Sequence, residues 1–318
     1  MRILITGGAG FIGSNLVEHL LQDERVSVVR VLDNLATGSL KNIEQFFTHP
    51  KFEFTEGDIR NYTSCLAACD GMNIISHQAA LGSVPRSIND PLTTNDVNIT
   101  GTLNIFNAAK EKNIKRIVYA ASSSTYGDHP GLPKVEDKIG NPLSPYAVTK
   151  YVNELYARVY ANLYNIELIG LRYFNIFGPK QNPDGPYAAV IPIFATALLN
   201  NQAPTINGDG THSRDFTFVE NAVQANISSL FTTNTEAVNQ VYNIACGKQT
   251  SLNELFEILK KVAGSDLKPI HGPERKADVK HSLADISKAK KLLGYDPKVS
   301  IAEGLSLTYK WNQEQHKG

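Results

Sequence analysis

Hydrophobic and polar positions in the first half of the chain repeat with two different periods. Short β-branched runs at 3–5 and 26–32 are typical of buried strands, and between them residues 14–22 place leucine and valine on one face of a helix. By the same criteria, strands are expected at 52–55, 74–77, 117–120 and 168–172, and helices at 102–112 and 145–165. Alternating strands and helices predict an α/β fold, a doubly wound parallel sheet that binds ligands beyond the carboxyl ends of its strands.

The pattern changes after Phe174. Four prolines between 179 and 192 indicate a loop-rich segment, and strand-like runs at 215–219 and 241–245 are expected to return to the main sheet. Helices near 252–262 and 286–293 then belong to a smaller C-terminal lobe. Because no linker composition separates the two parts, we expect them to pack closely.

Composition and charge narrow the functional classes. The 318 residues are 42% hydrophobic with a formal net charge of +0, which argues against broad binding to nucleic acid or to an anionic membrane. No apolar run approaches the ~20 residues needed to cross a bilayer, and the chain opens directly on a strand pattern, so we expect a cytoplasmic protein. Cys65, Cys69 and Cys246 are too few for a disulfide framework, and no metal site is expected.

A glycine cluster joins the first predicted strand to the first predicted helix. Gly7, Gly10 and Gly13 permit a tight turn, a close approach of backbone to a pyrophosphate, and close packing of helix on strand. The free N–H groups at the helix N-terminus then face the phosphates. Asp33 ends the second strand, where a carboxylate accepts hydrogen bonds from both ribose hydroxyls and repels a 2′-phosphate. The motif therefore predicts NAD, in preference to NADP, as the cofactor.

A tyrosine–lysine pair and three serines mark candidate chemistry. Tyr146 and Lys150 are four residues apart on a predicted helix and face the same way. A buried ammonium group near a phenol lowers the phenol pKa from about 10, and such a tyrosine can act as general base and acid near neutral pH. In isolation such a pair is better explained as two surface residues of an amphipathic helix. The serines at 122–124, however, follow the strand at 117–120, at the sheet edge where ligands bind.

Together these features resemble the extended short-chain dehydrogenase/reductases that modify nucleotide sugars. The resemblance extends over nearly the whole chain and includes the glycine motif, the segment 98–102, Ser122, the Tyr146–Lys150 pair and the segment 172–175. More narrowly, residues 81–91 and 120–156 are similar to bacterial UDP-N-acetylglucosamine 4-epimerases. The resemblance implies a homodimer that pairs through the helices near 102–112 and 145–165. It also implies a UDP-sugar as substrate.

The motif and the resemblance assign the chain to two regions. Residues 1–174, with returning segments near 211–245, are expected to form an NAD-binding Rossmann domain, and residues 175–210 and 246–318 a UDP-sugar-binding lobe. The expected cofactor-binding residues are Gly7, Gly10, Phe11, Ile12, Gly13, Asp33, Asn34, Asp58, Ile59, Gln78, Ala79, Ala80, Asn98, Tyr146, Lys150, Tyr173 and Phe174. The expected substrate-binding residues are Gly82, Ser83, Ser122, Ser123, Ser124, Tyr146, Asn175, Ala189, Val190, Arg214, Arg275, Asp278 and Ser282.

The resemblance implies individual roles in these two sets. Tyr146 transfers the proton, Lys150 binds the nicotinamide ribose, and Ser122 hydrogen-bonds the sugar O4. Tyr173 and Phe174 flank the nicotinamide.

The second set of roles concerns the nucleotide. Asn175 meets the diphosphate, Arg214 and Arg275 clamp it, as the planar arginine fork suits phosphate oxygens, and Asp278 binds a uridine ribose hydroxyl. For Asp58, a contact with the adenine edge and a plain loop or helix-capping role remain equally open.

The implied reaction inverts the sugar at C4. Tyr146 takes the proton of the C4 hydroxyl as the C4 hydride moves to NAD, and the 4-keto sugar turns about its diphosphate anchor. The hydride then returns to the other face. Because no net oxidation occurs, NAD stays bound throughout.

Other readings share the fold. A 4,6-dehydratase needs an Asp and a Glu where this chain has Ser123 and Ser124. A UDP-glucuronate decarboxylase usually has a Glu at the same place, which this chain also lacks. A non-catalytic NAD-binding regulator typically loses the Tyr146–Lys150 pair, which is present here. UDP-glucose 4-epimerase and UDP-N-acetylglucosaminuronate 4-epimerase stay open as alternatives.

Small residues favour an N-acetylated hexose. The Gly82–Ser83 pair and the Ala188–Ala189 pair leave room for a 2-acetamido group, and Ser282 is expected to keep the far wall open. These positions are equally compatible with ordinary loop packing.

Overall fold

The computed structural model describes residues 1–183, 188–274 and 280–317. Its central sheet has seven parallel strands in the order β11-β6-β5-β4-β1-β2-β3. The strands are β1 (Arg2–Thr6), β2 (Val28–Asp33), β3 (Phe52–Glu56), β4 (Ile74–His77), β5 (Arg116–Ser122), β6 (Glu167–Tyr173) and β11 (Gln240–Ile244). The predicted doubly wound parallel sheet is confirmed.

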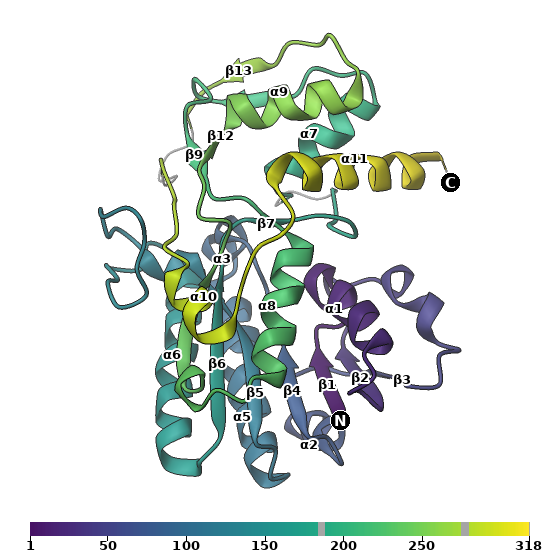
Figure 1. Cartoon of the computed structure of the whole chain (residues 1–318), viewed down its shortest axis with the longest axis vertical. Coiled ribbons are helices and arrows are strands. Elements are labelled where there is room, and N and C mark those ends of the chain that lie inside the picture. The colour runs from purple at the N-terminus through teal and green to yellow at the C-terminus, as the bar shows by residue number, and fades with distance from the viewer. Residues whose placement is uncertain (184–187, 275–279, 318) are drawn as a thin grey trace.

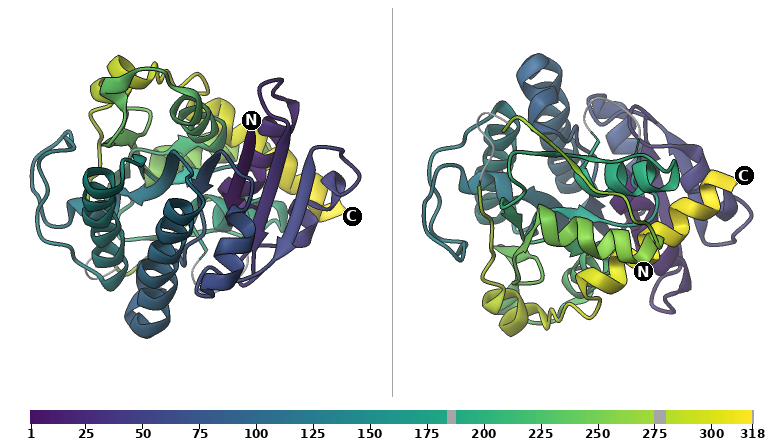
Figure 2. Two further views of the ribbon diagram at one scale, coloured as in Figure 1. Left: turned by 90° about the horizontal axis from the view of Figure 1, so that it is seen from below. Right: turned by 90° about the horizontal axis from the view of Figure 1, so that it is seen from above.

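Helices cover both faces of this sheet (Figures 1 and 2). On one face α1 (Phe11–Gln22) packs against α8 (Val219–Phe231), which crosses β4, β5 and β6. The other face carries α2 (Tyr62–Cys69), α5 (Gly101–Glu111) and α6 (Pro145–Tyr164).

Each face of the sheet packs into its own hydrophobic cluster. Ile3 and Ile5 of β1 belong to one cluster and Leu4 to the other, because successive strand residues point to opposite sides.

One returning strand differs from the prediction. β11 joins the sheet beside β6, as expected for 241–245. The run expected at 215–219 instead forms the short β10 (Thr217–Phe218), which pairs with β7 (Ile176–Phe177) outside the main sheet. The run is short because α8 begins at Val219, so only two residues remain extended.

The smaller lobe stands beyond the carboxyl ends of the strands, at the top of Figure 1. Its helices are α7 (Val190–Leu199), α9 (Leu252–Ala263) and α11 (Ile301–Lys317), and its two-stranded sheets pair β8 (Thr205–Asn207) with β13 (Ile270–Gly272) and β9 (Ser213–Arg214) with β12 (Thr250–Ser251). Phe194 and Phe256 pack edge to face within it, their ring centroids 6.2 Å apart, and belong to the same cluster as Ile3 of the main sheet. The two parts therefore share one core.

Shorter helices connect these elements. They are η1 (Leu40–Asn42), η2 (Glu44–Phe46), α3 (Val84–Asn89), α4 (Pro91–Asn95), the π-helical turn η3 (Asp96–Thr100), η4 (Ser123–Tyr126), η5 (Thr235–Ala237) and α10 (Ser287–Leu293). None of the helices in the described ranges is long and apolar enough to cross a membrane.

Candidate functional site

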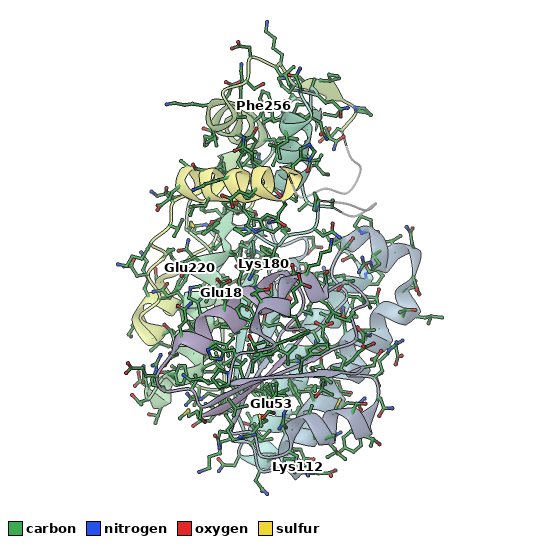
Figure 3. The ribbon with its side chains drawn as sticks, turned by 90° about the vertical axis from the view of Figure 1, so that its right-hand side faces the viewer. Glu18, Glu53, Lys112, Lys180, Glu220 and Phe256 are labelled. Atoms are coloured by element: carbon green, nitrogen blue, oxygen red, sulfur yellow. The ribbon has the colours of Figure 1, made fainter. Side chains whose placement is uncertain are left out.

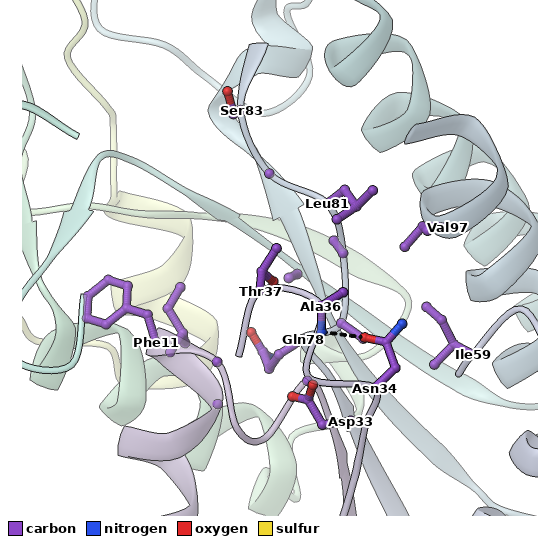
Figure 4. Close-up of a pocket in the computed structure, with 18 of the residues that line it drawn as sticks. Phe11, Asp33, Asn34, Ala36, Thr37, Ile59, Gln78, Leu81, Ser83 and Val97 are labelled. Atoms are coloured by element: carbon purple, nitrogen blue, oxygen red, sulfur yellow. Dashed lines mark hydrogen bonds between the residues drawn. The ribbon is translucent and has the colours of Figure 1, made fainter. Parts of the chain in front are cut away.

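A cavity of about 540 Å³ lies at the carboxyl ends of the strands. Figure 4 shows part of its wall. The residues predicted from the sequence that line it are Gly7, Gly10, Phe11, Ile12, Gly13, Asp33, Asn34, Asp58, Ile59, Gln78, Ala79, Ala80, Gly82, Ser83, Ser122, Tyr146, Lys150, Tyr173 and Asn175. The glycine turn, Asp33 at the end of β2 and Ser122 at the end of β5 thus line one cavity.

The glycine turn is shaped so that side chains would not fit. Gly7 has a φ of +72°, and a Cβ there would lie 2.7 Å from the backbone N of Ala79. A Cβ on Gly13 would lie 2.1 Å from the carbonyl oxygen of Gly7. Gly10 precedes α1 and has no side chain to cap it, so the first N–H groups of the helix remain available to a ligand. This arrangement fits a dinucleotide pyrophosphate.

Asp33 ends β2 at the other side of this turn. Its carboxylate accepts hydrogen bonds from the backbone N–H groups of Ala9 (2.9 Å) and Leu35 (2.8 Å), which fix its orientation. Burial raises its pKa, and these N–H groups oppose the rise. The carboxylate is thus a preoriented acceptor for a ligand's hydroxyl groups.

Asp58 lies on the same wall and is strongly acidic. Hydrogen bonds from the Arg60 side chain lower its pKa to about 2, against the effect of burial. Asn34 Nδ2 also donates to Asp58 Oδ2 at 2.8 Å. The cap of α2 is Asn61, so Asp58 does not cap that helix.

Ser122, Tyr146 and Lys150 converge on the cavity from β5 and α6. Ser144 caps α6 by accepting the N–H of Ala147 at 3.1 Å, and Pro145 starts the helix, which sets where Tyr146 points. Lys150 Nζ donates to the carbonyl of Ala120 at 2.8 Å and lies 5.9 Å from the centre of the Tyr146 ring.

The acidity of Tyr146 differs from the prediction. In the protein alone its pKa is raised, because burial disfavours the phenolate more than a hydrogen bond with Ser122 stabilises it. Lys150 does not reverse this, since burial lowers its own pKa to about 8. The lowering of the Tyr146 pKa that was expected from its proximity to Lys150 is therefore not observed in the protein alone.

The serine turn has a built-in polarity. Ser122 Oγ accepts hydrogen bonds from Ser124 N–H (3.1 Å) and from Ser124 Oγ (2.9 Å). Because both contacts use its acceptor capacity, the Ser122 proton is left to be donated into the cavity.

A buried histidine holds the segment that forms the cavity floor. His77 Nδ1 lies 2.6 Å from Thr6 Oγ1, and its Nε2 lies 3.0 Å from Thr102 Oγ1. Burial lowers the His77 pKa to about 3, so the ring is neutral. It thereby fixes β4 against β1 just before Gln78 and Ala79, which line the cavity.

Several predicted residues lie elsewhere. Asn98 is fully buried beneath the wall, where Nδ2 donates to the Leu81 carbonyl (3.1 Å) and Oδ1 accepts the Leu81 N–H (2.8 Å), and its neighbour Val97 lines the cavity instead. Phe174 is fully buried against Tyr126, because it follows Tyr173 in an extended chain and faces the opposite way.

The remaining predicted side chains divide in the same way. Ser123, Ser124 and Ser282 line neither this cavity nor the next. The Ser282 Oγ accepts the N–H of Asp215 at 3.4 Å, and its open-wall role stays a prediction. Arg275 and Asp278 lie outside the described residues.

A second cavity of about 640 Å³ adjoins the first through Asn175 and Ile176. Ala189, Val190 and Arg214 line it, in agreement with their expected proximity. Arg214 Nη1 donates to the carbonyls of Ser213 and Lys280, both at 3.0 Å. His212 also lines this cavity, and its Nε2 lies 3.2 Å from Glu274 Oε1.

Sequence reasoning missed a polar network behind the cavity. Asn226 of α8 is fully buried, donates to Tyr173 Oη at 2.7 Å and accepts from Gln78 Nε2 at 3.0 Å. Its signal was an amide on the apolar face of an amphipathic helix, between Ala222 and Leu230.

The other residues that line the first cavity were not predicted individually from the sequence. They are Leu32, Ala36, Thr37, Gly57, Arg60, Leu81, Thr93, Val97, Ala120, Ala121, Ile176 and Gln181. The turn that carries Gln181 is held to α1, since Lys180 Nζ lies 2.8 Å from Glu18 Oε2 (Figure 3) and Asn15 Nδ2 donates to the Pro179 carbonyl at 3.2 Å.

Comparisons with known proteins agree in family. The family described as GDP-mannose 4,6 dehydratase matches residues 4–308. A protein of Methanocaldococcus jannaschii named putative UDP-glucose 4-epimerase is 38% identical over 317 residues, 99% of each chain.

Two solved structures have nearly the same fold. UDP-N-acetylglucosamine 4-epimerase from the archaeon Methanobrevibacter ruminantium, in complex with UDP-N-acetylmuramic acid, has a TM-score of 0.93 and 39% identity, covering 99% of this chain and 98% of that one. UDP-glucuronic acid 4-epimerase from Bacillus cereus, in complex with UDP-glucuronic acid and NAD, has a TM-score of 0.92 and 31% identity, covering 99% and 100%.

Proposed function

Because the chain belongs to the extended short-chain dehydrogenase/reductase family of nucleotide-sugar epimerases, we propose that it inverts C4 of UDP-N-acetylglucosamine and UDP-N-acetylgalactosamine. At the coarser level it is an NAD-dependent UDP-sugar 4-epimerase. The observation that carries the proposal is the convergence of Ser122, Tyr146 and Lys150 at one end of a cavity whose other end holds the glycine turn.

The cofactor would occupy the larger part of the first cavity. The N-terminus of α1 would hold the pyrophosphate, the Asp33 carboxylate the adenosine ribose, and Lys150 the nicotinamide ribose. Tyr173, held by Gln78 and Asn226, would form the wall beside the nicotinamide. When bound, NAD takes up the hydride from C4 and later returns it.

The proton is handled by the chain's own side chains. Tyr146 takes the proton of the C4 hydroxyl and later gives it back, and Ser122, which hydrogen-bonds Tyr146 in the protein alone, would donate its proton to the sugar O4. Lys150 supplies a positive charge that favours the phenolate. The positive charge of the oxidised cofactor would add to this effect when it is bound.

The nucleotide would lie in the second cavity. Asn175 lines both cavities and Arg214 lines the second, which suits a diphosphate that extends from one to the other. Arg275 and Asp278 are proposed as further contacts on the sequence alone. On this basis residues 1–174, with returning segments near 211–245, form the NAD-binding domain, and residues 175–210 and 246–318 form the UDP-sugar-binding lobe.

The preference for an N-acetylated sugar rests on small residues. A Cβ on Gly82 would meet nothing within 4 Å, so the wall is open there, and Ser83 beside it offers a hydroxyl. Ala188 and Ala189 widen the second cavity. The M. jannaschii and B. cereus proteins keep UDP-glucose and uronic acid substrates as alternatives.

The test is a comparison of kcat/KM for UDP-N-acetylglucosamine, UDP-glucose and UDP-N-acetylglucosaminuronate, with products separated by chromatography. We expect UDP-N-acetylglucosamine to exceed UDP-glucose by roughly 10- to 200-fold, the range that one apolar contact supplies. Gly82→Val should narrow this ratio by filling the open wall. Equal or higher kcat/KM with UDP-glucose would contradict the proposed preference for a 2-acetamido sugar. If the protein binds NAD but converts no UDP-hexose, a non-catalytic NAD-binding regulator would be favoured.

We also propose that a second copy of the chain covers one face of α6. Four apolar side chains on this helix are exposed: Val148, Leu155, Val159 and Leu163, at 45, 43, 48 and 66%. A contiguous apolar face of this kind marks an interaction surface. Light scattering should give twice the monomer mass, and Leu163→Asp should lower it.

A further inference from the structure

A buried ion pair lies directly behind the candidate catalytic residues. Arg172 Nε and Nη2 donate to the two carboxylate oxygens of Glu154 at 2.9 and 2.7 Å, and the side chains are only 4% and 6% exposed. Replacing such a pair with apolar residues is often neutral or stabilising, so stability alone does not explain it.

The pair joins the elements that carry the site. Arg172 precedes Tyr173 on β6, and Glu154 lies one helical turn after Lys150 on α6. Glu154 Oε1 also lies 3.5 Å from the hydroxyl of Thr125, in the turn that follows the site serines. The Arg172 guanidinium donates to the carbonyl of Glu136 at 2.9 Å. Movement of α6 relative to β6 and to the serine turn would therefore break several buried contacts at once.

The pair also sets the charge around Lys150. On α6 itself the titratable groups besides Lys150 are Tyr146, Tyr151, Glu154, Tyr156, Arg158, Tyr160 and Tyr164. The neighbouring elements carry His77 on β4, Arg116 and Tyr119 on β5, Glu167, Arg172 and Tyr173 on β6, Tyr126 on η4, Asp96 on η3, Arg86 on α3, and Lys110 and Glu111 on α5. Asp96 is half exposed and faces Arg60 at 3.8 Å. Of these groups, Glu154 is the buried carboxylate, and its negative charge opposes the effect of burial on the Lys150 pKa.

We propose that Glu154 is a positioning residue for the Tyr146–Lys150 pair. Held by Arg172, it fixes α6 against β6 and the serine turn and supplies the buried negative charge that keeps Lys150 protonated. This inference rests on the proposed function, because it assigns Lys150 a role as an ammonium group in that reaction.

The test compares Glu154→Gln with wild type in UDP-sugar turnover across pH. Glutamine keeps the volume and removes the charge. Lys150 must be protonated, so activity falls as pH rises through its pKa; without Glu154 that pKa falls further. We expect the alkaline limb to move to lower pH by about 0.5 unit or more, and kcat at pH 8 to fall at least about 2-fold, with KM for the UDP-sugar within about 2-fold.

Matched variants separate charge from packing. Glu136→Gln removes a neighbouring buried carboxylate that accepts the Asn243 N–H at 2.9 Å, and it should lower Tm without moving the alkaline limb. Glu154→Asp should keep the limb near its wild-type position. The double variant Glu154→Gln/Arg172→Met should regain Tm relative to Glu154→Gln while its limb stays below that of wild type.

Two failures remain distinguishable. If Glu154→Gln lowers both kcat and Tm but leaves the alkaline limb within about 0.2 unit of wild type, the pair is structural only and the inference is overturned. If wild type epimerises no UDP-sugar while carrying NAD, the proposed function itself fails, and the Tm comparison of the four variants still reports on packing.

Discussion

The two adjoining cavities are built in different ways. The first is assembled mainly from backbone turns at the ends of parallel strands, and a Cβ on Gly13 would lie 2.1 Å from a neighbouring carbonyl. The second is walled by side chains of α7, β8, β9 and the loops between them, such as Phe194 and Phe216. Because backbone geometry restricts the residue type at each position, the first cavity can be predicted from a sequence motif. In the second cavity many combinations of side chains give a similar shape, so its specificity cannot be predicted from a motif.

The largest expected effect separates chemistry from binding in the first cavity. Tyr146→Phe should lower kcat by ~10² to 10⁴, because a positioned general base is lost while the ring volume is kept. NAD content, measured in the supernatant of denatured protein, and Tm should stay near wild type. Tyr151→Phe is the matched control, since it removes a hydroxyl from the same helix without lining either cavity. Wild-type turnover in Tyr146→Phe would remove this residue from the mechanism.

The next effect tests whether the glycine turn depends on backbone alone. Gly13→Ala should abolish NAD retention and lower Tm, because its Cβ would overlap the Gly7 carbonyl. Gly10→Ala should do much less, since its Cβ would lie 3.2 Å from the same oxygen. Both proteins can be denatured and assayed for released dinucleotide. Equal NAD content in the two variants would contradict the steric account, and release of NADP in place of NAD from wild type would overturn the role of Asp33.

A smaller effect should be confined to the second cavity. Arg214→Met removes a charged hydrogen-bond donor, and such bonds contribute about 1.5–3 kcal/mol. We therefore expect KM for the UDP-sugar to rise roughly 10- to 150-fold while NAD content is unchanged. Calorimetry with UDP alone should show a matching loss of affinity. A fall in NAD content would show instead that the two cavities are not independent.

The smallest expected effect concerns Asp215, whose carbonyl accepts a hydrogen bond from Asn175 between the two cavities, and it is measured as a change in thermal stability. Asp215 is fully buried and accepts backbone N–H groups from Cys246 (2.9 Å), Gly247 (3.0 Å) and Ala284 (3.2 Å). Burial raises its pKa to about 6. Because the folded-state pKa is raised, its stabilising contribution is present below the ordinary carboxyl pKa and is lost as pH rises through about 6.

The measurement is Tm between pH 4 and 7 for wild type and Asp215→Asn. The variant should be less stable throughout, since three buried N–H groups lose a charged acceptor. The difference between the two proteins should widen as pH falls, because only wild type gains a proton in this window. Asp33 and Glu136 also have raised pKa values, but they are common to both proteins. A constant difference across the range would argue against the assignment to Asp215.

The sequence predicted the parts of the site that local periodicity controls. The helix expected at 145–165 is observed at Pro145–Tyr164, and Asp33 ends its strand as the motif requires. Phe174 was misplaced although strand alternation excludes it once Tyr173 faces the cavity.

The prediction that Asn98 lies at the cofactor cavity differs from the structure for another reason. It lies in a π-helical turn, whose extra residue shifts the faces of the helix and brings Val97 to the cavity. Nothing in the local pattern marks such a turn. The same holds for Asn226, whose partners Tyr173 and Gln78 come from distant strands.

The position of β11 affects how the protein is made. β11 is the last strand of the central sheet in chain order and pairs with β6. The helix α8, which covers β4, β5 and β6, also comes late in the chain. During synthesis, the edge of β6 therefore stays unpaired until β11 has been made, and Val118, Ile169 and Leu171 stay uncovered until α8 has been made. Such edges and apolar faces template aggregation. Chains that end before this point would expose the edge of β6, whereas completion of β11 pairs that edge and makes β11 the outer strand of the sheet.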